Sequence, residues 1–245
     1  SRLPKGSLHN IRASGATAAT MQTEQTPLQR HVGESGLPAG AEENFNPVKA
    51  MGMVVIMVGV GMAVGLGLAY AVYFGGHTAA FDAKIGILKA NDMSSVYFAV
   101  FTICVTVSWL NTFPMYYKGK VMYQDSGNLR ANMLIYKVNH PDTSKSSPYV
   151  VLEEEGGVGQ YNRANRSMHH FVENSAGVML SVLAAGYVFP APVLVLVIIY
   201  SIGRLVHQVG YAQGGYGSHA PGFVLQWLPA LALQMLVFLA ACKSA

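Results

Sequence analysis

The chain has 245 residues, of which 51% are hydrophobic and only 11% are charged, and its formal net charge is +4. So few charged residues argue against an ordinary soluble domain. The basic residues are scattered and are not interleaved with aromatic residues, so no nucleic-acid-binding surface is expected. The two cysteines, Cys104 and Cys242, both lie in apolar segments and cannot form a disulfide framework.

Residues 1–47 form an extended polar tail that is rich in glycine, alanine, serine, threonine and proline. Such a tail buries too little apolar area to offset its own ordering entropy, so we expect it to become ordered only against protein partners. The chain begins at Ser1 without an initiator methionine, which suggests that an organellar targeting segment was removed. A shortened sequence is the alternative. We therefore expect a mitochondrial or plastid membrane, with the endoplasmic reticulum as the alternative.

About five apolar segments follow the tail, each near the roughly 20 residues that a helix needs to cross a bilayer. Because the backbone of a spanning segment must satisfy its own hydrogen bonds, all of them are predicted to be helices. They lie near residues 50–75, 93–117, 166–188, 191–212 and 223–242. The lipid bilayer is thus the first predicted partner.

The first of these helices, within residues 48–76, carries a GxxxG pattern at Gly61 and Gly65 that permits close helix approach. This face is a candidate contact for other membrane-protein subunits. A short connector at 77–92 leads to the second helix. Residues 118–160 then form a long polar loop, and its positive balance places it on the cytoplasmic or equivalent side. The three consecutive glutamates near its end are interpreted as a solvated turn and not as a metal site.

Two stripes of polar side chains lie on the predicted third and fourth helices. Where the third helix begins, the spacings are three, four and three, and the residues are Arg163, Arg166, His170 and Glu173. At about 100° per residue, these four fall within roughly 80° of one another on a helix. The second stripe has spacings of four, three and four and consists of Tyr200, Arg204, His207 and Tyr211. Because charge inside an apolar helix costs several kcal/mol, the stripes suggest a shared pocket for an anionic, polar ligand.

Both stripes resemble known motifs. Residues 161–174 read YNRANRSMHHFVEN and resemble the second-helix signature of the MAPEG family, membrane proteins of eicosanoid and glutathione metabolism. Arg166 and Glu173 stand at the arginine and glutamate of that signature, while His170 replaces its usual asparagine. Residues 203–211 read GRLVHQVGY and are similar to the third helix of the family's prostaglandin E synthases. The resemblance covers roughly residues 93–242.

The resemblance implies an all-α integral membrane protein, a four-helix MAPEG-like bundle with one additional amino-terminal transmembrane helix. It also implies a homotrimer that binds glutathione between subunits, with arginines on its carboxylates and Glu173 on its ammonium group. The implied ligands are Arg166, Glu173, Arg204 and Tyr211, with Arg163, His207 and His170 as further candidates. The alternative is that Glu173 pairs with Arg166 or Arg204 and holds the helices together without a ligand.

The loop between the last two helices departs from the family pattern. Active members stabilise the glutathione thiolate there with an arginine, because a cation lowers the thiol pKa and the thiolate is the nucleophile. Residues 212–222 contain no arginine or lysine, and Ser218 or His219 stands at the expected catalytic position. Neither side chain is a permanent cation.

Two functions are compatible with these features. The first is a catalytically weakened MAPEG relative that acts as an accessory or structural subunit of a larger organellar membrane complex. The missing loop arginine and the additional helix favour it. The second is a glutathione-dependent membrane transferase, peroxidase or isomerase, which the retained Arg166, Glu173, Arg204 and Tyr211 favour.

Overall fold

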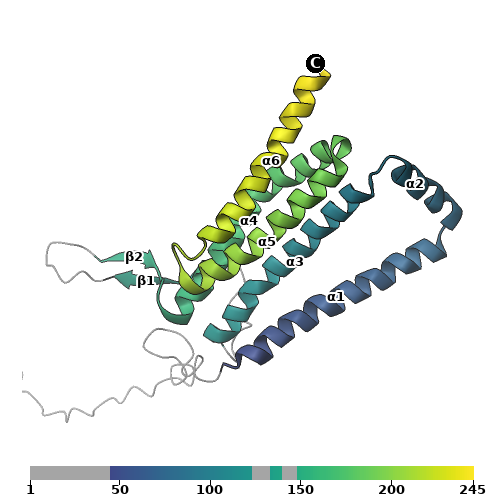
Figure 1. The fold of residues 1–245 in the computed structure, drawn as a ribbon. Helices are drawn as coiled ribbons and strands as arrows, with labels where there is room; N and C mark the ends of the chain where they lie inside the picture. Colours follow the sequence, from purple (N-terminus) through teal and green to yellow (C-terminus); the bar gives the residue numbers. More distant parts are fainter. Residues whose placement is uncertain (1–44, 123–132, 140–147) are drawn as a thin grey trace, which may run out of the picture.

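The computed structural model describes residues 45–122, 133–139 and 148–245. These residues form six helices and a two-stranded sheet (Figure 1). In chain order they are α1 (Pro47–Gly75), α2 (Thr78–Ala90), α3 (Ser94–Met122), β1 (Tyr136–Asn139), β2 (Tyr149–Leu152), α4 (Gly156–Val188), α5 (Pro190–Gly214) and α6 (Ala220–Ser244). All the helices except α2 are long and apolar enough to cross a membrane, which confirms the five predicted spans.

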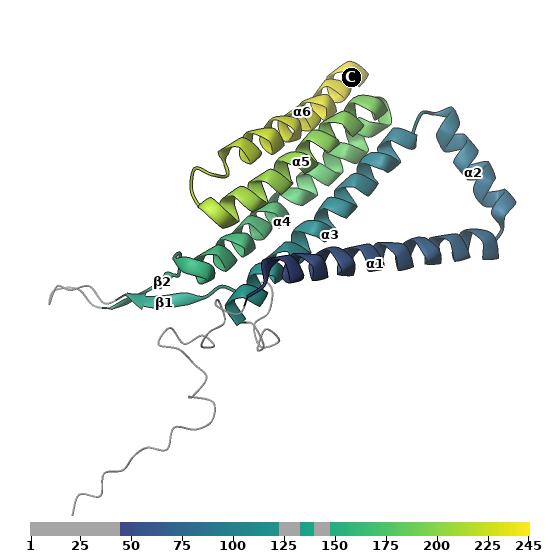
Figure 2. The same ribbon diagram turned by 60° about the horizontal axis from the view of Figure 1, so that its bottom comes forward.

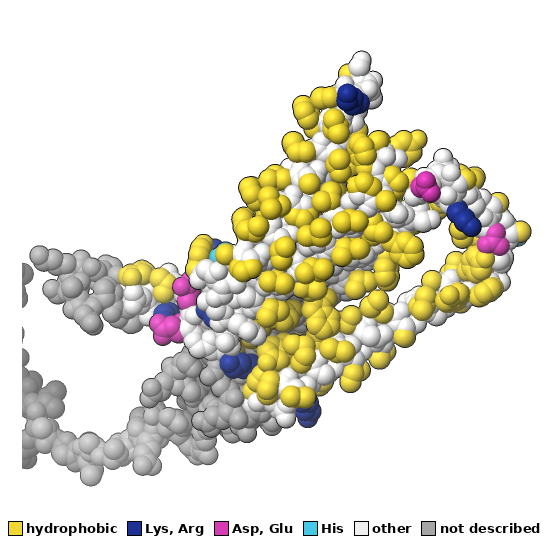
Figure 3. All heavy atoms as spheres, viewed as in Figure 1, with side chains coloured by type: hydrophobic (Ala, Val, Ile, Leu, Met, Phe, Trp, Pro, Cys, Tyr) yellow, Lys and Arg dark blue, Asp and Glu magenta, His cyan; other side chains and the backbone are white. Residues whose placement is uncertain are grey.

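Helices α3, α4, α5 and α6 pack into one bundle, and α5 contacts the other three (Figures 1 and 2). Small, branched and aromatic side chains fill its core: Ala99, Ile103, Leu110, Phe171, Val178, Val182, Ala185, Val193, Val197, Tyr200 and Leu233. On the face shown in Figure 3, hydrophobic side chains cover the long helices, while charged side chains lie near their ends and along α2. This arrangement confirms the all-α membrane fold and the predicted four-helix bundle with an additional amino-terminal helix.

Two connections contain more secondary structure than the sequence suggested. The connector at 77–92 holds helix α2, which has 13 residues and joins α1 to α3. The loop predicted at 118–160 is shorter, because α3 continues to Met122, α4 begins at Gly156, and a hairpin lies between them. Hydropathy marks only the part of a helix that suits the lipid core, whereas a helix can continue with polar residues into the interface.

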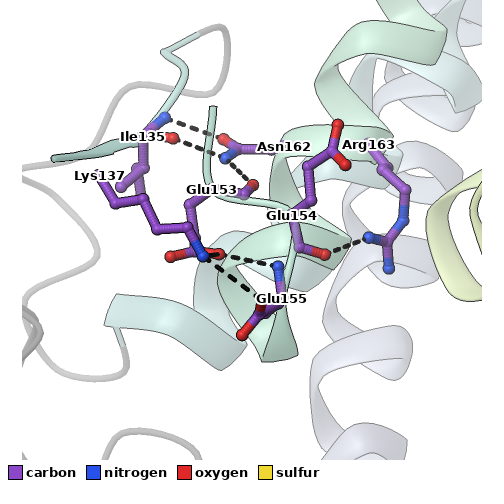
Figure 4. Close-up of polar contacts among 7 residues, drawn as sticks. All are labelled: Ile135, Lys137, Glu153, Glu154, Glu155, Asn162 and Arg163. Atoms are coloured by element: carbon purple, nitrogen blue, oxygen red, sulfur yellow. Dashed lines mark hydrogen bonds and ion pairs between the residues drawn. The ribbon is translucent and has the colours of Figure 1, made fainter. Parts of the chain in front are cut away.

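The hairpin of β1 and β2 is antiparallel and is anchored on α4 (Figure 4). The Asn162 side chain accepts from the Ile135 N–H at 2.9 Å and donates to the carbonyls of Ile135 and Glu153, both at 2.7 Å. The Lys137 ammonium lies 3.0 Å from the Glu153 carboxylate and 3.5 Å from that of Glu155. Glu154 and Glu155 are exposed, as in the predicted solvated turn, whereas the less exposed Glu153 also holds the hairpin through Lys137.

Helix α1 stands apart from the bundle over most of its length and is joined to it through α2 (Figures 1 and 2). Val54, near its beginning, is its one buried residue. A Cβ added at Gly61 or Gly65 would meet nothing within 4 Å, so the described part of the chain does not use the GxxxG face. Its contact with other subunits stays a prediction. Most of the predicted tail lies outside the described residues.

Several helix ends gather at one end of the molecule (Figure 1). The starts of α1, α4 and α6 lie there together with the ends of α3 and α5, and the hairpin extends from the same end. The antiparallel order of the helices thus brings the connections after α3 and after α5 to one side. The polar stripes of α4 and α5 lie in the turns nearest to this end.

Candidate functional site

A polar pocket of about 200 Å³ lies between α4, α5 and the beginning of α6. Its walls are formed by Arg166, Ser167, His170, His207, Tyr211, Tyr216, His219 and Phe223. Arg166 and His170 come from the first predicted stripe, and His207 and Tyr211 from the second. The two stripes therefore share one pocket, which is the arrangement that their spacing suggested.

Two glycines allow α5 and α6 to approach closely enough to close this pocket. A Cβ at Gly203 would lie 2.5 Å from the backbone nitrogen of Gln226. A Cβ at Gly222 would overlap the backbone nitrogen of His207. Since no larger residue fits at either position, the start of α6 lies directly on α5. This contact places Gln226 beside Arg204 and His219 beside His207.

The Arg204 guanidinium is buried behind the pocket, and the side chain is only 1% exposed. It donates to the Gln226 Oε1 at 2.7 Å and to the Ser167 carbonyl at 2.9 Å. The Phe171 ring centroid lies 5.1 Å from its central carbon. Arg204 thus ties α5 to α4 and α6 through neutral acceptors. It forms no ion pair with an acidic side chain among the described residues.

Three histidines line the pocket in mutual ring contact. The centroids of His170 and His207 lie 5.8 Å apart with nearly parallel planes, and those of His207 and His219 lie 5.3 Å apart, edge to face. The His207 Nδ1 lies 3.0 Å from the Ser167 Oγ, which fixes the imidazole orientation. The Tyr211 and His219 rings also meet edge to face at 5.3 Å. The pocket can therefore offer imidazole and phenol groups to a polar ligand.

The remaining predicted site residues lie away from the pocket. The Arg163 guanidinium donates to the carbonyls of Tyr211 and Ala212, at 3.2 and 3.3 Å, and satisfies the end of α5. Glu173 is exposed and forms no ion pair with Arg166 or Arg204, so the suggested salt bridges are not present in this chain. Ser218 packs its hydroxyl against Gly214, outside the pocket, whereas His219 lines it.

Sequence reasoning missed several residues of the site. Ser167 follows Arg166 directly and lies one turn after Arg163, so the period of the first stripe includes it. Gln226 is a polar residue in an otherwise apolar helix, a signal that often marks a buried contact. Tyr216 carries no such signal because it lies in the turn between α5 and α6, and Phe223 carries none because it is an apolar residue in the first turn of an apolar helix.

Comparison with known protein families agrees with this geometry. Residues 126–239 match the family model described as MAPEG family. The region that carries the pocket is thus similar to the MAPEG family. The matched range covers the hairpin, α4, α5 and most of α6, which carry the pocket, and confirms the resemblance seen in the two stripes. Comparisons with curated proteins and with solved structures found no match.

MAPEG proteins generally use glutathione, and the pocket supplies groups for some of the interactions of such a ligand. The Arg166 side chain is exposed at its edge and can bind a carboxylate. The turn between α5 and α6 contributes Tyr216 and His219 but no arginine or lysine. This turn therefore offers the pocket an imidazole N–H and no fixed positive charge.

Proposed function

We propose that this MAPEG-like protein is catalytically weakened and serves as an accessory subunit of a larger membrane complex, in a mitochondrial or plastid membrane. The observation that carries the proposal is the placement of the cations. Arg204 is bound by Gln226 and the Ser167 carbonyl, and Arg163 is bound to the end of α5. Arg166 is the one cationic residue of the pocket wall, on the side of α4.

A glutathione thiol needs a cation close to its sulfur to become a thiolate at neutral pH. On the α6 side of this pocket the available groups are the His219 imidazole and the Tyr216 phenol. A neutral donor stabilises a thiolate less than a guanidinium does, because it supplies a hydrogen bond without a full charge. Slow thiol chemistry is the expected consequence.

The additional helix supports the second half of the proposal. Helix α1 lies outside the range that matches the family and presents large apolar side chains on all its sides over most of its length. Its glycine pattern permits close approach of another helix. In the described part of the chain, no helix lies against these glycines. The bundle does not need α1 to close its core, so α1 is free to contact other subunits.

The second candidate is a glutathione-dependent membrane enzyme, and the buried charge of Arg204 favours it. No carboxylate among the described residues neutralises this guanidinium, and Arg166 adds a second positive charge nearby. Two uncompensated cations attract an anionic ligand such as glutathione. Under this alternative His219 or Ser218 would assist the thiolate.

The two candidates differ in thiolate formation. We expect the purified protein with glutathione to show little ultraviolet thiolate absorbance and slow turnover of a reactive electrophile. His219→Arg restores the family cation and is expected to raise both. Ala220→Arg is the matched control, because it adds the same charge to an exposed neighbour outside the pocket. Strong thiolate absorbance and turnover in the unmodified protein would support the enzyme and contradict catalytic weakening.

A further inference from the structure

A second cavity, which none of the pocket histidines lines, lies between the beginning of α1 and the end of α3. Its volume is about 560 Å³, and it is lined by Phe45, Asn46, Lys49, Ala50, Met53, Val54, Met57, Met115, Lys118 and Gly119. The Phe45 ring meets the Tyr116 ring edge to face at 5.3 Å and closes one end. The site is built largely by α1, so it does not belong to the part of the chain that matches the family.

Charge and apolar surface are separated along this cavity. Lys49 lies in the first turn of α1 and Lys118 in the last turns of α3, so both lysines lie at the membrane surface. Met53 and Met57 follow Lys49 by one and two turns, about 6 and 12 Å deeper at 1.5 Å per residue. Methionine side chains adapt to flexible apolar chains. The cavity therefore has a cationic mouth and an apolar wall that continues into the membrane.

The two lysines have no acidic partner among the described residues, where the ion pairs are those of Lys137 with Glu153 and Glu155. A third lysine of the same helix end differs, because the Lys120 ammonium donates to the Gln160 Oε1 at 2.9 Å. In Figure 3, basic side chains lie at this end of α1, while hydrophobic side chains cover the rest of the helix.

We propose that the cavity between α1 and α3 binds an anionic phospholipid, with its phosphate between Lys49 and Lys118 and an acyl chain along Met53, Met57 and Met115. Basic pockets between transmembrane helices are suited to anionic headgroups, and each lysine near the surface contributes attraction. The methionine wall accounts for the tail, which a free phosphate lacks. The inference is independent of whether the histidine pocket is catalytic.

Native mass spectrometry of the full chain in detergent tests the site, with phosphatidylglycerol and phosphatidylcholine of identical acyl chains as probes. We expect one saturable phosphatidylglycerol per chain and at least about tenfold weaker phosphatidylcholine binding. Lys49→Gln and Lys118→Gln should each weaken phosphatidylglycerol binding about fivefold. Lys120→Gln is the matched control and should leave the affinity unchanged.

A second pair of variants distinguishes lipid binding inside the cavity from general electrostatic attraction of lipid to the protein surface. Met57→Trp fills the cavity without a change of charge and should abolish saturable binding. Met62→Trp places the same side chain on an exposed part of α1 away from the cavity. This control variant should retain saturable phosphatidylglycerol binding. Circular dichroism confirms that each variant stays helical. Equal binding of the two lipids, equal effects of all three lysines, or normal binding by Met57→Trp would overturn the proposal and leave the cavity to a protein segment or to detergent.

Discussion

The buried Arg204 guanidinium joins α5 to both α4 and α6 through its hydrogen bonds. A guanidinium inside a membrane bundle is costly unless its donors are satisfied, and here Gln226 and the Ser167 carbonyl satisfy two of them. The sequence identified Arg204 as a candidate ligand because of its spacing with His207 and Tyr211. It could not reveal Gln226 as a partner, since that contact depends on how closely α6 approaches α5.

Removing the partner of this charge should destabilise the protein. Gln226→Leu keeps the volume but leaves a charged donor buried without its acceptor, so the free energy of unfolding should fall by about 2 kcal/mol. Gln234→Leu, at an exposed position on the same helix, is the control and should have little effect. Thermal unfolding in detergent measures both. If the two variants unfold at the same temperature, the contact between Arg204 and Gln226 does not support the bundle.

Glu153, which pairs with Lys137 of the hairpin, should make the attachment of the hairpin to α4 pH-dependent. Burial raises the pKa of the Glu153 carboxyl, but the Glu155 N–H and the Lys137 ammonium outweigh it, and the pKa lies below the ordinary value of 4.5. The stabilisation is therefore present above this ordinary value and is lost as the pH falls through the lower pKa of the folded state. The hairpin amides should lose protection from hydrogen exchange as the pH falls below 4.5, relative to the intrinsic rate at each pH.

Glu153→Gln provides the comparison for this prediction. The variant keeps a hydrogen-bond acceptor but has no titrating group at that position, so its hairpin should be less protected at neutral pH and change little on acidification. Protection that falls with pH identically in both proteins would show that another group controls the attachment.

Among the elements, the contact of α5 with α6 decides whether the pocket exists. Gly203 and Gly222 form this contact, and each faces backbone of the opposite helix. The two stripes were predictable because a helical period can be read from the sequence. The glycine contact was not, because Gly61 and Gly65 carry an equally suggestive pattern and yet face no neighbour in the described part of the chain.

Gly222→Ala should therefore separate α5 from α6. The added methyl group would overlap the His207 backbone, which should cost about 1–3 kcal/mol as overpacking does in other cores. Gly177→Ala, at an open position of α4, is the control and should be neutral or slightly stabilising. Thermal unfolding and glutathione binding by both variants measure the effect. Equal stability of the two variants would mean that the close approach is not required.

For the whole molecule, the sequence predicted the five spans, the four-helix bundle and the additional amino-terminal helix. The spans follow from composition over about 20 residues, which tertiary contacts seldom override in lipid, whereas the bundle and its additional helix follow from the family resemblance. Helix α2 and the hairpin were missed because they lie in polar segments, where hydropathy carries little information. The site was predicted in part: Arg166, His170, His207 and Tyr211 share a pocket, whereas Glu173, from the same stripe, is exposed and does not line it.

The most direct test of the proposed accessory role is the size and composition of the native assembly. The full chain, tagged at its carboxyl terminus, is purified from its own membranes in a mild detergent, and its mass and co-purifying polypeptides are determined. We predict an assembly well above the mass of three copies, with other membrane subunits in fixed proportion, and release of the bundle when residues 1–47 are removed. A homotrimer without other polypeptides, unchanged by that truncation, would contradict the account.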